Sequence, residues 1–146
     1  MKLAGFFKIC FLISSLSFST YTRAQNPENW TSDQLIQPAD LAKVLEAGKD
    51  LPVIFSVGPG AYIPHSVNIG MVKDKDKLDK LKTELKSIAK DRKIVVYCGC
   101  CPFANCPNVR PAIKALKDMK FTNYFLLNIP KNIKTDWIDK GYPVVK

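Results

Sequence analysis

Hydrophobic residues along the chain recur at intervals of three and four in some segments and form continuous runs in others. In residues 38–47 the helical spacing predicts a helix that Pro38 opens and Gly48 closes. Residues 75–90 repeat this spacing through three leucines and Ile88, with lysines and aspartates between them. This second segment therefore predicts an amphipathic helix with a single apolar stripe.

Short apolar runs lie between and after these helices. Residues 52–57, 93–97 and 124–129 are rich in β-branched and aromatic side chains, which is typical of strands covered on both faces. We expect a further helix from Pro111 and a short final helix over residues 135–140. Strands that alternate with helices predict an α/β fold, with a central parallel sheet flanked by helices on both faces.

The first 24 residues have the pattern of a secretory signal peptide. Lys2 and Lys8 flank the start of an apolar stretch that is too short and too rich in serine for a permanent membrane span. Small residues precede a predicted cleavage site after Ala24. We expect a signal peptide over residues 1–24, an extended N-terminal segment over residues 25–34 and one domain over residues 35–146.

Composition and charge narrow the class of partner. The chain is 47% hydrophobic and 24% charged, with a net charge of +9 that falls to +6 without the basic residues of the signal peptide. Alternating charges, as in residues 73–77, are typical of a solvated face and argue against nucleic-acid binding. We expect an exported protein, periplasmic or secreted, with no stable membrane insertion once the signal peptide is removed.

Four cysteines fall within nine residues, between a predicted strand and a predicted helix: Cys98, Cys100, Cys101 and Cys106. Ligands of parallel sheets bind beyond the carboxyl ends of the strands, where this loop begins. The N–H groups of a tight loop and the positive end of a helix dipole both favour a thiolate, and Arg110 adds a fixed positive charge. The loop is therefore a candidate site for a nucleophilic cysteine or a bound anion.

Three stretches, in the same order, resemble the rhodanese-like (sulfurtransferase) family. They are Ile-Val-Val-Tyr-Cys at residues 94–98, Ile-Pro-His-Ser-Val-Asn-Ile at 63–69, and Trp-Ile-Asp-Lys-Gly-Tyr-Pro-Val at 137–144. The resemblance implies that Cys98 takes a sulfane sulfur from a small anionic donor such as thiosulfate. The resulting persulfide would pass its sulfur to cyanide or a thiol acceptor.

The sequence departs from the family at the expected site. A strand that commonly ends Asp-Val-Arg ends here at Gly58 without either charge, Tyr62 replaces a usual histidine, and the cysteine loop is twice the usual length. His65, where the family usually has glycine, is interpreted as a surface turn residue. Strand position makes Cys98 the expected nucleophile and Cys106 the competing candidate. Substrate contacts are expected from four loop residues: Gly99, Cys100, Cys101 and Arg110.

Other uses of the four thiols remain open. In an oxidising compartment, Cys98 and Cys106 could form a disulfide, or another pair could bridge across the loop. Four thiolates could instead hold Zn²⁺ or Cu(I), although adjacent ligands crowd one ion and the spacing lacks paired Cys-x-x-Cys motifs. Thiol–disulfide exchange with a redox partner protein is a further alternative. No cofactor is expected.

Overall fold

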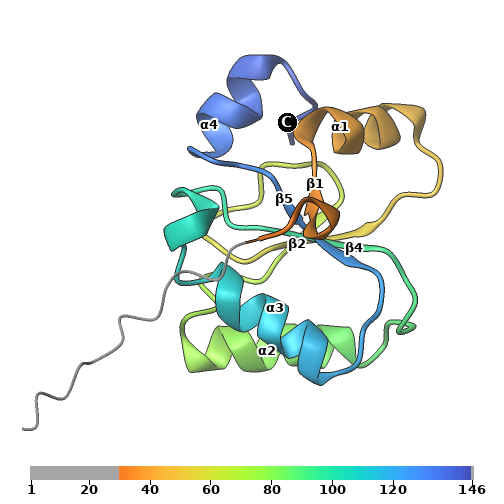
Figure 1. Cartoon of the computed structure of the whole chain (residues 1–146), viewed down its shortest axis with the longest axis vertical. Coiled ribbons are helices and arrows are strands. Elements are labelled where there is room, and N and C mark those ends of the chain that lie inside the picture. The colour runs from red at the N-terminus through yellow and green to blue at the C-terminus, as the bar shows by residue number, and fades with distance from the viewer. Residues whose placement is uncertain (1–29, 146) are drawn as a thin grey trace, which may run out of the picture.

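A five-stranded, entirely parallel sheet forms the centre of the computed structural model, which describes residues 30–145 (Figure 1). The strands lie in the order β1-β5-β4-β2-β3, so that β4 is central. Val53 of β2 is in register with Ile94 of β4, which is in turn in register with Tyr124 of β5. The strand bounds are β1 Leu35–Ile36, β2 Val53–Ser56, β3 Ser66–Asn68, β4 Ile94–Tyr97 and β5 Tyr124–Leu127.

Helices cover both faces of this sheet. Helices α2 and α3 lie on one face, and α1 and α4 lie on the other (Figure 1). The predicted α/β fold class, with a parallel sheet between two helical layers, is therefore confirmed. The helix bounds are α1 Pro38–Ala47, α2 Lys75–Leu85, α3 Val109–Asp118 and α4 Ile133–Asp136.

Strand β4 divides its side chains between the two layers. Ile94 and Val96 pack in the layer of α2 and α3, whereas Val95 and Tyr97 pack in the layer of α1 and α4. Successive side chains of a strand point to opposite faces. Cys98 continues the row of Ile94 and Val96 and therefore lies in the layer of α2 and α3.

Several element boundaries differ from those predicted. Helix α1 spans the predicted residues, but α2 ends at Leu85 and the chain passes through turns in which the Ile88 N–H reaches the Leu85 carbonyl. Helix α3 begins two residues before Pro111, because a proline within the first turn needs no N–H partner. The predicted final helix is two short pieces, α4 and the 3₁₀ turn η3 (Ile138–Lys140).

The edge strand β1 was not predicted, because a strand of two residues shows no hydrophobic period. It follows η1, a 3₁₀ turn at Ser32–Gln34, within a segment predicted to be extended. Trp30 packs against the layer of α2 and α3. The predicted signal peptide and residues 25–29 lie outside the described residues, so export stays a prediction. Over residues 30–145, no helix is both long enough and apolar enough to span a membrane.

Candidate functional site

The loop that carries the cysteines leaves the carboxyl end of β4 and is tied to neighbouring segments. The Ile133 N–H donates to the Gly99 carbonyl at 2.8 Å, and the Phe103 N–H reaches the Ile129 carbonyl at 3.4 Å. Gly99 has φ +82, and a Cβ there would lie 3.0 Å from the Ile133 Cβ. A side chain at this position would be strained and crowded, so glycine sets the path of the loop.

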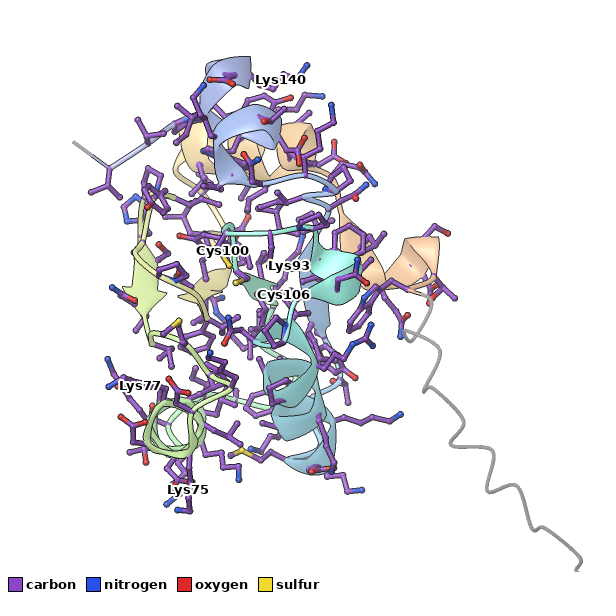
Figure 2. The ribbon with its side chains drawn as sticks, turned by 90° about the vertical axis from the view of Figure 1, so that its left-hand side faces the viewer. Lys75, Lys77, Lys93, Cys100, Cys106 and Lys140 are labelled. Atoms are coloured by element: carbon purple, nitrogen blue, oxygen red, sulfur yellow. The ribbon has the colours of Figure 1, made fainter. Side chains whose placement is uncertain are left out.

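The loop brings all four of its thiols together. We call Cys98, Cys100, Cys101 and Cys106 the thiol cluster; their Sγ atoms all lie within 4.8 Å of one another. The Cys98 and Cys100 sulfurs are 3.2 Å apart, and the Cys100 and Cys101 sulfurs are 3.4 Å apart. Figure 2 shows Cys100 and Cys106 close together near the start of α3. All four thiols are free, so the possible Cys98–Cys106 disulfide is not formed in this structure.

The four cysteines differ in exposure. Cys98 is 3% exposed and Cys106 is fully buried, and both belong to the apolar layer of α2 and α3. Cys100 is exposed and Cys101 is half-buried. The cluster therefore runs from the core to the surface. These four thiols are the group in the described part of the chain that could hold a metal ion.

Asn108 is a site residue that the sequence analysis missed. Its side-chain amide, 3% exposed, donates to the Cys98 sulfur at an Nδ2–Sγ distance of 3.5 Å. Its Oδ1 accepts the backbone N–H of Lys73 at 3.0 Å, which fixes the orientation of the amide. The only signal in the sequence was a polar residue just before α3.

The surroundings distinguish the two buried thiols electrostatically. The pKa of Cys98 is lowered, chiefly by interaction with the Cys106 thiol and also by the Cys100 N–H and the Asn108 amide, although burial opposes this. The pKa of Cys106 is raised by the neighbouring Cys98 and by burial. Desolvation raises the pKa of both Cys100 and Cys101. The thiolate is therefore best accommodated on Cys98.

Gly58, just beyond the end of β2, lies directly against Cys98. A Cβ at this position would be 2.6 Å from the Cys98 sulfur and 2.5 Å from the Cys98 carbonyl oxygen. No side chain can be placed there unless the start of the cysteine loop moves. The absence of a charged side chain at position 58 is thus a steric requirement of the site.

Arg110 holds the loop from its far end. Its Nη2 donates to the Ala104 carbonyl at 2.7 Å, which links α3 to the 3₁₀ turn η2 (Phe103–Asn105). Its predicted role as a counter-charge for a sulfur anion stays a prediction. His65 is exposed and has φ +62, in agreement with its interpretation as a surface turn residue.

The chain matches no protein-family model and no curated protein. Its fold is similar to that of the Alr3790 protein from Anabaena sp., a crystal structure, with a TM-score of 0.53. The two are 20% identical, and the similarity covers 75% of this chain and 90% of that chain. The likeness shows a shared fold and is consistent with a parallel α/β architecture.

Proposed function

We propose that this protein is a rhodanese-like sulfurtransferase that carries sulfane sulfur as a persulfide on Cys98. The observation that carries the proposal is the placement of the Cys98 sulfur, at the carboxyl end of the central strand β4 with the Asn108 amide directed at it. Hydrogen bonds from N–H donors stabilise a sulfur anion before and after it accepts a sulfur atom.

The stretches that resemble the family support this proposal by their positions around β4. The Tyr97 hydroxyl accepts the N–H groups of Tyr62 at 3.0 Å and Ile63 at 3.3 Å, which joins the Ile-Pro-His stretch to the end of β4. Trp137 of the C-terminal stretch is fully buried in the same layer as Tyr97. The three stretches thus meet at the end of β4, where the cysteine loop begins.

The proposed reaction is two nucleophilic displacements at sulfur. The Cys98 thiolate attacks the sulfane sulfur of thiosulfate; a sulfur–sulfur bond forms to Cys98, the donor's sulfur–sulfur bond breaks, and sulfite leaves with the electron pair. Cyanide then attacks the terminal sulfur of the persulfide, thiocyanate departs, and the thiolate is restored. The two steps balance without an added oxidant or reductant.

The burial of Cys98 favours a small donor. Its side chain is only 3% exposed, and the exposed thiol of Cys100 lies 3.2 Å away on the solvent side. We therefore expect a compact anion to require less displacement of the loop than a bulky donor.

Mass spectrometry tests this function directly. Reduced protein treated with thiosulfate should gain one sulfur atom, and peptide mapping should place it on Cys98. Cys98→Ser should abolish the gain, whereas Asn105→Ala, exposed in the same loop, is the control and should retain it. Absence of sulfur on every cysteine would overturn the proposal, and sulfur on Cys106 alone would make the competing candidate the nucleophile.

A further inference from the structure

We propose that the thiol cluster also binds Zn²⁺ as a tetrahedral tetrathiolate site. The cluster has the dimensions of such a site before any ion is bound. A zinc–sulfur bond of about 2.3 Å places the corners of a regular tetrahedron about 3.8 Å apart. The four Sγ atoms lie within 4.8 Å of one another, and the Cys98–Cys100 and Cys100–Cys101 sulfurs are 3.2 Å and 3.4 Å apart, so this spacing falls inside the observed range.

The adjacent cysteines do not prevent this arrangement. The objection raised by the sequence was that two adjacent ligands crowd one ion. Here the sulfurs of Cys100 and Cys101 are already 3.4 Å apart and need only a small separation to become two corners of the tetrahedron. Cys98 and Cys106 supply the other two corners from the buried side.

A hydrogen-bond donor beside Cys98 provides part of the outer shell that supports metal-bound thiolates. The Asn108 amide donates to the Cys98 sulfur. Cys106 lies three residues before Val109, the first residue of the ten-residue helix α3. Hydrogen bonds of this kind orient metal ligands and disperse their negative charge. The positive end of the helix dipole acts in the same direction.

The charge of the surrounding loop is compatible with the bound ion. Four thiolates and one Zn²⁺ carry a net charge of −2. Residues 98–110 contain no aspartate or glutamate and one arginine, Arg110, so no carboxylate of this loop opposes the site. An all-sulfur donor set selects a thiophilic cation over the hard cations Mg²⁺ and Ca²⁺, and a tetrahedral four-sulfur geometry is characteristic of Zn²⁺.

The loop holds the thiols in position through contacts that do not involve the ion. Gly99 is fixed by Ile133, and Ala104 is fixed by Arg110. Binding replaces the remaining thiol protons, which pass to solvent, and nothing is oxidised or reduced. Because the ion would occupy the Cys98 sulfur, the zinc-bound protein should not form a persulfide.

Cobalt provides a spectroscopic probe for this site. Reduced protein titrated with Co²⁺ under anaerobic conditions should develop the visible bands of tetrahedral cobalt and a sulfur-to-cobalt charge-transfer band. Both should saturate at one equivalent and disappear on addition of one equivalent of Zn²⁺. Cys100→Ser and Cys101→Ser remove outer ligands without opening the core, and each should weaken Co²⁺ binding at least about tenfold. Asn105→Ala, in the same loop but without a ligand atom in the cluster, is the control.

Several outcomes would overturn this proposal. They are an absence of the charge-transfer band, spectra unchanged in both outer cysteine variants that circular dichroism shows to be folded, or binding of Cu(I) with no binding of Co²⁺ or Zn²⁺. The cobalt titration contains no sulfur donor, so its result is independent of the sulfurtransferase assay. Either activity can therefore fail without the other.

Discussion

The inner and outer halves of the thiol cluster lie in different surroundings. Cys98 and Cys106 are buried among apolar side chains of the layer formed by α2 and α3. Cys100 and Cys101 extend from the same loop toward solvent. The inner thiols are therefore positioned by the folded core, whereas the outer thiols are positioned by the loop. Changes to the core and changes to the loop should affect the two halves separately.

The largest expected difference is in reactivity toward a bulky reagent. In the native, reduced, metal-free protein, a large maleimide should label Cys100 at least about 100-fold faster than Cys106, because Cys106 is fully buried and reacts only after local opening. A time course analysed by peptide mass spectrometry measures both rates. In denaturant the rates should converge, which is the control. Equal rates in the native protein would contradict the division into halves.

A second prediction concerns the contact between β2 and the inner half. Gly58→Ala should destabilise the protein by about 1–3 kcal/mol, because the new methyl group would overlap the Cys98 sulfur and carbonyl oxygen. Urea unfolding measures this loss. The displaced Cys98 should also lose sulfur uptake from thiosulfate.

Gly48→Ala is the matched control for this substitution. Gly48 has φ +64, so the backbone conformation strains an alanine at this position. A Cβ there has no atom within 4 Å, so the substitution causes no overlap. The control should lower stability while sulfur uptake on Cys98 is retained. Normal uptake in Gly58→Ala would show that the contact does not position the sulfur.

The arrangement of strands and helices could be predicted because the residues that each element buries form a regular pattern in the local sequence. The apolar run that forms β4 and the spaced leucines of α2 each identify an element without knowledge of its neighbours. The loop could also be placed at the end of β4, since the carboxyl ends of parallel strands lie along one edge. Strand β1 was not predicted, because its two residues form a strand only through their pairing with β5.

The interior of the site could be predicted only in part. The sequence identified all four cysteines, because their clustering is local. It did not identify Asn108 or the steric role of Gly58, because each acts through a contact with Cys98 that is long in sequence or lies within an irregular loop. Arg110 was chosen for its charge, whereas its observed hydrogen bond to Ala104 depends on how the loop folds.

The smallest predicted effect is that of removing the Asn108 amide on the rate of persulfide formation. This group helps to lower the pKa of Cys98, so Asn108→Ala should raise that pKa toward its ordinary value. Below the pKa of the variant, a smaller fraction of Cys98 is thiolate, and persulfide formation from thiosulfate should slow by roughly two- to fivefold. Above the pKa of both proteins, Cys98 is ionised in each and their rates should converge.

The shape of this pH profile separates the two contacts of Asn108. Its Oδ1 also accepts the Lys73 N–H, so the substitution can disturb the loop as well as the sulfur. A purely structural disturbance would lower the rate by the same factor at every pH, whereas loss of the donor moves the profile toward higher pH. Asn105→Ala, exposed in η2, should leave the profile unchanged. If the rate of Asn108→Ala falls by the same factor at every pH, Asn108 acts on the structure of the loop. The pKa of Cys98 is then lowered by its other neighbours.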